Sequence, residues 1–264
     1  MNYCLQKKPE RIVCLTEETT EVLYLLGQAK RIVGISAYTV RPDKAKREKP
    51  IVSAFIGGNV KKICALKPDL IIGFSDIQAK LARDLVSANQ QVLIFNQRSI
   101  QEILDVILII GRLVGAERRA QALVKKYIRR IQTLQRRTLR KRKRTRVYFE
   151  EWDSPMICGI RWVSELIHLA GGQDVFEHKS YGKNAQGRMV SAEEVTRAAP
   201  EIIIGSWCGK PFDPSSVRAR SGFDTVPAVL NDQLYEMDSS IILQPGPACL
   251  TDGLDRLEVL LSHR

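Results

Sequence analysis

The sequence predicts an α/β protein made of two lobes with parallel sheets, joined by a single long backbone α-helix. Apolar runs of strand length alternate with helical patterns in the first and last parts of the chain. One long helical pattern, from Ser99 to about Arg140, separates these two regions. A short pattern of a helix, Pro with an acid, three apolar residues and Gly also occurs once in each region. We therefore predict an N-terminal lobe over residues 1–98, a connecting helix over 99–144 and a C-terminal lobe over 145–264.

In the N-terminal region, short apolar runs have the composition of buried strands. These strands are predicted at Arg11–Leu15, Arg31–Ile35, Leu70–Gly73 and Gln91–Phe95. Helical patterns between them are predicted over Thr16–Gly27, Val60–Leu66 and Gln78–Ser87. Thr16 suits the start of the first helix and Gly27 its end. This alternation predicts a Rossmann-like lobe around a parallel sheet.

The connecting segment has an apolar face with helical spacing. Its apolar residues are Ile100, Ile103, Leu104, Ile107, Leu108, Ile110 and Leu113, followed more sparsely by Leu123, Ile128, Ile131 and Leu134. Gly111 and Gly115 interrupt this pattern. We predict a bend or break of the helix near Gly115.

The same alternation returns in the C-terminal region. Strands are predicted at Arg146–Phe149, Ile202–Gly205 and Gln233–Met237. Helices are predicted at Ile160–Ala170, Ser191–Ala198 and Ala248–His263. The second lobe is therefore expected to be Rossmann-like as well.

The repeated pattern lies in residues 60–74 and again in 191–206. Each copy is a short amphipathic helix, then Pro and an acid, then three apolar residues and Gly. A second match relates residues 20–27 to 163–171, in the same order along the chain. The two matches indicate a duplicated lobe, with chance similarity between α/β units as the alternative.

The positive charge of the chain is confined to one stretch. The net charge is +12, yet residues 118–146 hold 14 Lys or Arg and no Asp or Glu. Subtracting those 14 charges leaves −2 for the rest of the chain. The basic run at 136–146 contains no aromatic residue, so base stacking is not indicated and nucleic acid is not an expected partner. It is either a solvated helix end or a contact for phosphates or an anionic membrane surface.

The chain start and the cysteines bear on the compartment. Residues 1–10 lack the apolar run of a secretory signal, and Cys4 has no such run before it. No stretch is apolar enough to span a bilayer. The six cysteines are scattered, without the paired spacing of a zinc site. These observations predict free thiols and a cytoplasmic protein, or a periplasmic one if a leader was omitted.

Several motifs carry a resemblance that covers residues 9 to 262. They are Pro9–Leu15, the A-L-K-P-D-L-I-I pattern within Ile63–Ile72, Arg161–Gly172, Pro200–Gly205 and Gly253–Asp255. Through them the chain resembles helical-backbone (class III) ABC-transporter substrate-binding proteins of the cobalamin-binding and iron-siderophore-binding type. The resemblance implies a non-enzymatic protein that holds a large solute, such as cobalamin or another corrinoid, in a cleft between two lobes. A ferric siderophore or haem is the alternative ligand. An ABC permease is the implied partner, without an assignment of docking carboxylates, and no cofactor is implied beyond the ligand.

The ligand-binding residues are expected beyond the carboxyl ends of the strands, where open parallel sheets bind ligands. Aromatic faces there suit a flat ligand, Glu151 suits a cationic or hydroxyl-rich one, and Arg98 and Arg188 suit an acidic group. The predicted ligand-binding residues are Glu17, Tyr38, Phe55, Phe74, Gln97, Arg98, Glu151, Trp152, Arg188, Trp207, Cys208 and Gln244.

Two other functions fit parts of the sequence. An enzyme on the same scaffold would use Glu150 or Glu151 with Cys208, although no histidine partner for the cysteine is evident. A nucleic-acid-associated protein would act through the basic run. The leading interpretation is a ligand-binding protein in which no chemical step occurs.

Overall fold

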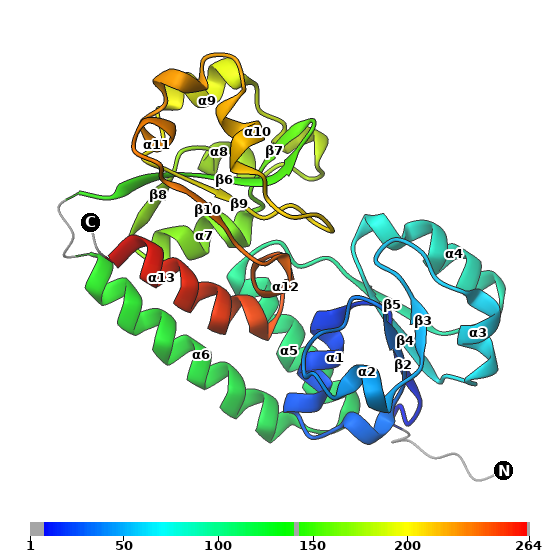
Figure 1. Ribbon diagram of the computed structural model, residues 1–264. Helices are drawn as coiled ribbons and strands as arrows, with labels where there is room; N and C mark the ends of the chain where they lie inside the picture. Colours follow the sequence, from blue (N-terminus) through cyan, green and yellow to red (C-terminus); the bar gives the residue numbers. More distant parts are fainter. Residues whose placement is uncertain (1–7, 140–142, 263–264) are drawn as a thin grey trace, which may run out of the picture. The chain divides into compact units, whose positions relative to one another are not determined.

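The computed structural model describes residues 8–139 and 143–262 (Figure 1). These residues form two compact units. The N-terminal unit runs up to Gln97 and includes Gln101–Lys126, and the C-terminal unit takes Arg98–Ile100 and the chain from Tyr127 onward. Each unit is described by itself.

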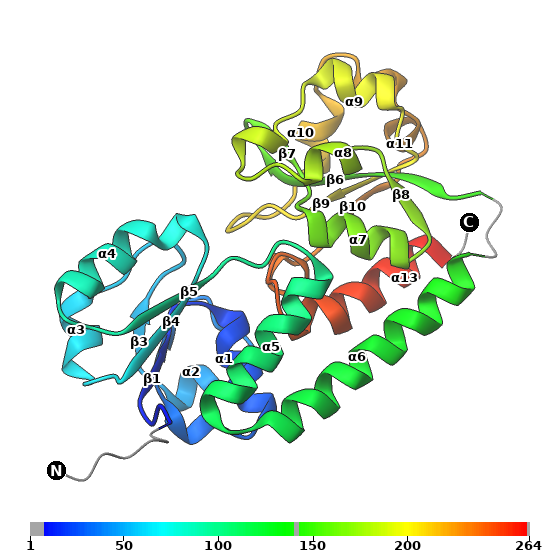
Figure 2. The same ribbon diagram turned by 180° about the vertical axis from the view of Figure 1, so that it is seen from behind.

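The N-terminal unit is a parallel sheet between helices. The strand order is β3-β2-β1-β4-β5. Both views place this sheet between α1 on one face and α3 and α4 on the other (Figures 1 and 2). Its strands are β1 (Ile12–Cys14), β2 (Ile32–Ser36), β3 (Ile51–Ser53), β4 (Leu70–Phe74) and β5 (Val92–Phe95). Its helices are α1 (Glu17–Leu25), η1 (Ala29–Arg31), α2 (Ala45–Glu48), α3 (Val60–Ala65), η2 (Asp76–Gln78) and α4 (Ala79–Ser87).

The C-terminal unit is also a sheet covered on both faces. Strands β10, β9, β6 and β7 lie side by side in that order, and β8 pairs with β6. The pairs are parallel except β6 with β7, which is antiparallel. The strands are β6 (Thr145–Asp153), β7 (Met156–Cys158), β8 (Gly172–Asp174), β9 (Ile202–Gly205) and β10 (Leu234–Glu236). The helices are α7 (Arg161–Leu169), α8 (Glu177–Ser180), η3 (Gln186–Arg188), α9 (Ala192–Ala198), α10 (Pro214–Arg218), η4 (Phe223–Thr225), α11 (Pro227–Leu230), α12 (Ser239–Ile242), η5 (Cys249–Gly253) and α13 (Leu254–Ser262).

The connecting segment consists of two helices rather than one. Helix α5 (Ile100–Val114) ends just before Gly115, and α6 (Glu117–Thr138) begins just after it (Figure 2). Gly115 has a φ of +68°, which glycine adopts without the strain that a side chain adds. The predicted break is therefore confirmed, and the single continuous helix is not what the structure shows.

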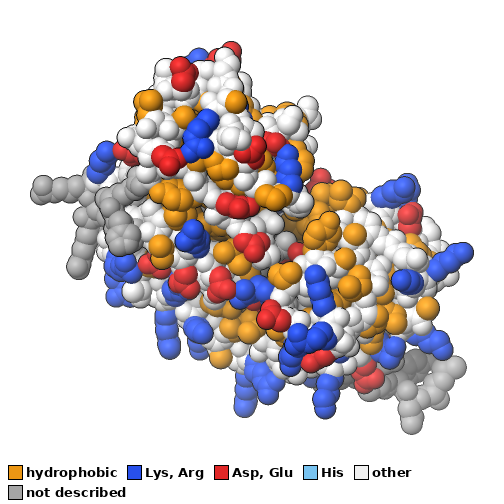
Figure 3. All heavy atoms as spheres, viewed as in Figure 1, with side chains coloured by type: hydrophobic (Ala, Val, Ile, Leu, Met, Phe, Trp, Pro, Cys, Tyr) orange, Lys and Arg blue, Asp and Glu red, His pale blue; other side chains and the backbone are white. Residues whose placement is uncertain are grey.

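The basic stretch forms an exposed face of α6. Figure 3 shows Lys and Arg side chains along the edge where Figure 1 draws this helix. Arg130 is an exception, since it pairs with Asp255 and with Glu258 on α13. Arg137 also pairs with Glu258, at 3.1 Å. Part of the basic run, residues 140–142, lies outside the described residues, as does Cys4.

The duplicated pattern has the same contacts in both units. The Arg11 guanidinium donates to the Leu66 carbonyl, and the Arg146 guanidinium donates to the Ala198 carbonyl. The acid after each proline accepts a hydrogen bond from the backbone N–H of the matching arginine. The Arg11 N–H donates to the Asp69 carboxylate at 2.9 Å, and the Arg146 N–H donates to the Glu201 carboxylate at 2.9 Å.

The glycine that ends the pattern also has the same role in both units. A Cβ on Gly73 would lie 2.5 Å from Oε1 of Gln78, and a Cβ on Gly205 would lie 1.9 Å from the Phe212 ring. Each glycine thus makes room for a side chain from the segment that follows the strand. Shared contacts at four positions support a duplicated lobe over chance similarity.

Short elements and one strand end differ from the sequence prediction. Helix α2 and strands β3, β7 and β8 were not predicted. Strand β6 also continues through Asp153, whereas the sequence places residues 150–153 in a loop. The strand continues because β7 pairs antiparallel with its second half. In the described part of the chain, no helix is long and apolar enough to cross a membrane.

Candidate functional site

Two acidic side chains are buried just beyond β1, at the start of α1. Glu17 is 5% exposed and Glu18 is 4% exposed. The Thr16 hydroxyl donates to Oε1 of Glu18 at 2.6 Å, while Oε2 of each glutamate has no hydrogen-bond partner. Burial raises the pKa of Glu17 to about 7 and that of Glu18 to about 8, because a carboxylate is poorly solvated there. At neutral pH this edge of the sheet therefore carries carboxyl groups close to their titration points.

The neighbouring loops of the N-terminal unit are fixed by the buried side chain of Gln78. Its amide donates to the carbonyls of Leu15 and Phe55 and accepts from the backbone N–H of Phe74. The Phe55 ring meets Tyr38 edge-on, with ring centroids 6.4 Å apart. Three predicted residues, Tyr38, Phe55 and Phe74, are thus held by one network at the carboxyl ends of the strands. The sequence prediction missed Gln78, because its partners are backbone groups and two of them, Leu15 and Phe55, are distant in sequence.

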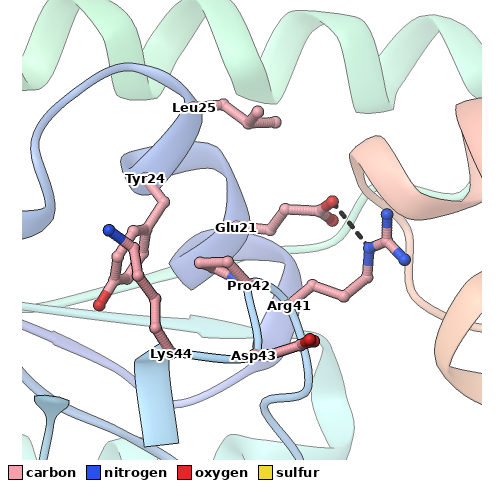
Figure 4. Close-up of a pocket in the computed structure, with 7 residues that line it drawn as sticks. All are labelled: Glu21, Tyr24, Leu25, Arg41, Pro42, Asp43 and Lys44. Carbon is pink, nitrogen blue, oxygen red and sulfur yellow. Dashed lines mark hydrogen bonds and ion pairs between the residues drawn. The ribbon is translucent and has the colours of Figure 1, made fainter. Parts of the chain in front are cut away.

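A pocket of about 510 Å³ opens beside α1 in the same unit (Figure 4). The Glu21 carboxylate points to Arg41 Nε at 3.0 Å, and Lys44 Nζ lies 5.4 Å from the centroid of the Tyr24 ring. Glu21 and Arg41 of this wall therefore form an ion pair. The residues that line it are Glu21, Tyr24, Leu25, Arg41, Pro42, Asp43 and Lys44, none of which was a predicted site residue.

In the C-terminal unit, Glu150 is the centre of a buried hydrogen-bond network. Its side chain is fully buried and accepts from the Tyr148 hydroxyl at 2.8 Å and from Trp207 Nε1 at 3.0 Å. The Arg220 guanidinium donates to both of its oxygens, at 2.5 and 2.9 Å. Burial alone lowers the pKa of Arg220, but the hydrogen bonds and charge of Glu150 outweigh it and raise that pKa. Glu150 therefore orients Trp207 and holds the Arg220 guanidinium.

An aromatic cluster lies around Trp207. The ring of Phe212 packs edge-on against it, with centroids 5.0 Å apart. Lys210 Nζ lies 4.8 Å from the centroid of Trp207 and 4.7 Å from that of Trp152. Lys210 also lies 2.7 Å from the Asp153 carboxylate. Lys210, which the sequence prediction missed, thus contacts the rings of both predicted tryptophans.

Arg188 and Glu151 form a nearby ion pair. The Arg188 guanidinium donates to both Glu151 oxygens, at 2.5 and 2.9 Å, and to the Cys158 carbonyl at 2.7 Å. Arg188 is 4% exposed, so its charge is neutralised within the protein. The two residues were predicted to orient opposite kinds of ligand group. The structure pairs them with each other, and contact with a ligand remains a prediction.

The remaining predicted residues differ in exposure. Gln97 and Gln244 are buried, Arg98 is half-buried and Cys208 is exposed. Their ligand contacts also remain predictions. Among residues 8–139 and 143–262, no group of three or more His, Cys, Asp or Glu is placed to hold a metal ion.

Comparison with known proteins gives a match over most of the chain. The family model described as periplasmic binding protein matches residues 12–241. A Bacillus subtilis (strain 168) relative, the uncharacterized ABC transporter substrate-binding lipoprotein YvrC, is 26% identical over 96% of this chain and 80% of its own length. The vitamin B12-binding protein of Vibrio vulnificus (strain CMCP6) is 26% identical over 93% of this chain and 88% of its own.

A solved structure shows the same fold over nearly the full length. It is described as a possible iron-binding (periplasmic solute-binding) protein of Staphylococcus epidermidis ATCC 12228. The TM-score is 0.81 at 25% identity, covering 98% of this chain and all of the other. Two lobes with parallel sheets, the predicted fold class, are confirmed.

The predicted cytoplasmic location is wrong. The similar proteins are periplasmic binding proteins and a lipoprotein, which points to a location outside the cytoplasm. Free thiols were part of the argument for the cytoplasm, and the cysteines of the described chain are indeed free. They do not require a reducing compartment, because a chain of this size buries a large core and needs no disulfide for stability.

Proposed function

Because this chain belongs to the periplasmic binding protein family and is a solute-binding protein, we propose that its solute is a corrinoid such as cobalamin. The aromatic cluster of the C-terminal unit carries this proposal. Trp152 and Trp207 offer wide apolar faces for a large flat ligand, and the Glu150 network holds Trp207 in one orientation. The vitamin B12-binding relative, which matches along almost the full chain, supports the same ligand class.

The protein performs no chemistry on its ligand in this proposal. Of the two acids that an enzyme would use, Glu150 contacts Tyr148, Trp207 and Arg220, and Glu151 is paired with Arg188. Cys208 is exposed in the loop after β9. Membership of the family and the ABC-transporter relative support delivery of the solute to a permease.

An iron chelate is the second candidate ligand. It is favoured by the solved relative described as a possible iron-binding protein, which is 25% identical.

Titration of the purified protein with cyanocobalamin, ferrichrome and haem tests the proposal. We expect saturable one-to-one binding of cyanocobalamin, followed by its visible absorbance and by calorimetry. Trp207→Leu is expected to weaken that binding tenfold or more, because a stacking surface is lost. Saturable binding of ferrichrome or haem alone would replace the corrinoid with that ligand.

Leu230→Ala is a matched control for the tryptophan variant. Leu230 is 68% exposed at the end of α11, just before β10, and so lies toward the amino edge of the sheet. Ligands of parallel sheets bind at the opposite edge. Leu230→Ala should therefore leave the affinity unchanged, and equal losses in both variants would contradict the assignment of the site.

A further inference from the structure

The lysine of the aromatic cluster covers the surface that the proposed ligand needs. Lys210 Nζ is within 5 Å of the ring centroids of both Trp152 and Trp207. Both distances lie in the range of cation–π attraction, which extends to about 6 Å. The Asp153 carboxylate, 2.7 Å from the same ammonium group, adds an ion pair. One side chain thus has three attractive contacts at one place.

The rings are oriented by other parts of the unit and not by the lysine. Trp207 Nε1 donates to Glu150 at 3.0 Å, and Trp152 Nε1 donates to the Ser154 carbonyl at 2.9 Å. The chain turns back over Trp207 at Gly209, whose φ of +84° is in the region that favours glycine. The two ring positions therefore do not depend on Lys210, and removing its side chain should leave them in place.

The ammonium group also influences the acid that holds it. Burial alone raises the pKa of Asp153, but the hydrogen bond and charge of Lys210 outweigh burial, so that pKa lies below its ordinary value. Asp153 is therefore ionised throughout the neutral pH range. The ion pair is therefore available at neutral pH in the protein before a ligand binds.

We propose that Lys210 acts as an internal ligand of the Trp152–Trp207 pair, closing it until a flat, uncharged ligand displaces the ammonium group. This proposal rests on the function proposed above. Trp207 is only 5% exposed, because it packs in the core of the unit and because Lys210 lies over its ring, so a ligand gains little of its surface while the lysine stays in place. The ammonium group can leave without being buried, because the Lys210 side chain is 40% exposed.

Displacement costs part of the binding energy, which makes Lys210 a residue that sets affinity without contacting the ligand. Exposed cation–π contacts and exposed ion pairs are each weak. Their loss on binding should lower the affinity for a flat, uncharged ligand roughly threefold to tenfold. Removing the lysine is therefore expected to tighten binding, which is the opposite of removing an ordinary contact residue.

The first experiment uses the ligand-free protein. Acrylamide quenching of tryptophan fluorescence should increase in Lys210→Ala, because the two indoles become accessible. Trp162 gives a constant background, since it is 3% exposed and its Nε1 donates to the Ile242 carbonyl. Lys80→Ala, an exposed lysine on α4 of the other unit, is the control and should quench like the wild type. Unchanged quenching in Lys210→Ala would overturn the proposal.

The second experiment measures the affinity for cyanocobalamin. Lys210→Ala should bind it roughly threefold to tenfold more tightly than the wild type does, and Asp153→Asn should tighten binding by less. The double variant should match Lys210→Ala alone, because Asp153 acts only through the lysine. Unchanged or weaker binding in Lys210→Ala would overturn the proposal, since the lysine would then be neutral or a ligand contact.

The two experiments separate this proposal from the proposed function. If neither the wild type nor any variant binds cyanocobalamin, ferrichrome or haem, the proposed function is wrong. The quenching result then still decides whether Lys210 shields the indoles. If the wild type binds cyanocobalamin but Lys210→Ala shows no gain, only the role of the lysine is wrong.

Discussion

Both units bury acidic side chains near a central strand of the sheet but treat them differently: Glu17 and Glu18 follow β1, whereas Glu150 lies within β6. Glu17 and Glu18 in the N-terminal unit each have an oxygen without a partner. Glu150 in the C-terminal unit is more deeply buried, yet it receives two hydrogen bonds from Arg220 besides those of two neutral donors. The N-terminal unit thus accommodates its buried acids through raised pKa values, and the C-terminal unit accommodates Glu150 by pairing it with Arg220.

This difference follows from the cost of burying charge. An isolated buried carboxylate is costly, so the group shifts its pKa upward and takes a proton. A carboxylate paired with arginine and fully hydrogen-bonded can stay ionised. The first arrangement responds to pH near neutrality, whereas the second depends on its cation. We therefore call Glu17 and Glu18 the adjustable edge of the fold, because their protonation changes near neutral pH. We call the Glu150 network the rigid edge.

The largest effect is expected from breaking the rigid edge. Arg220→Met leaves Glu150 fully buried without its cation and should destabilise the protein by about 4 kcal/mol, as breaking a buried ion pair does. Urea unfolding followed by circular dichroism measures this. The control is Arg218→Met, whose partner Asp232 is 81% exposed, with an expected change within about 1 kcal/mol. Equal costs for the two variants would show that Glu150 does not depend on Arg220.

Much of the fold was predictable because local patterns specify it. The Pro–acid–apolar–Gly pattern predicted β4 and β9, and the structure shows why it recurs. Asp69 and Glu201 cap the neighbouring strands, and Gly73 and Gly205 admit a side chain. Strand β3 was missed because Ile51 and Val52 are too short an apolar run to be recognised. The end of β6 was missed because polar residues normally indicate a loop.

The polar residues of β6 are tolerated in a strand because of partners distant in sequence. Glu150 pairs with Arg220, which is 70 residues away, and Glu151 pairs with Arg188, which is 37 residues away. Single-sequence patterns do not reveal such pairs. The tryptophans were predictable from their position after strands, but Lys210 was not, since one lysine in a loop carries no signal. The ligand contacts of the predicted residues still await the binding experiments.

The adjustable edge should show itself in the pH dependence of stability. The folded pKa values of Glu17 and Glu18, about 7 and about 8, lie above the ordinary 4.5. Between these values the folded state holds protons that the unfolded state has lost, so stability falls as pH rises from about 4.5 to 8. Glu17→Gln/Glu18→Gln should remove this loss, so its stability relative to that of the wild type should rise as pH increases to 8.5.

The control for that variant titrates with the opposite sign. The hydrogen bond from Tyr24 holds the pKa of Glu48 below its ordinary value, so its contribution is present at neutral pH and is lost as pH falls. Glu48→Gln should therefore leave the fall in stability between pH 5 and 8.5 in place. Urea unfolding at four pH values measures all three proteins. A Glu17→Gln/Glu18→Gln variant that is destabilised at pH 8.5 would mean that the ionised carboxylates have partners.

The smallest effect is expected from the Glu151–Arg188 ion pair. The burial of its carboxylate lies between that of Glu150 and that of Asp232. Glu151 has a side chain 23% exposed, whereas Arg188 is buried and keeps the Cys158 carbonyl as an acceptor when the acid is neutralised. Glu151→Gln should thus cost only about 1–2 kcal/mol in urea unfolding, with Asp232→Asn as the exposed control near zero. A cost as large as that of Arg220→Met would mean that stability does not follow burial of the carboxylate. Stability would depend instead on burial of the arginine. The difference between the two units would then come from their arginines and not from their carboxylates.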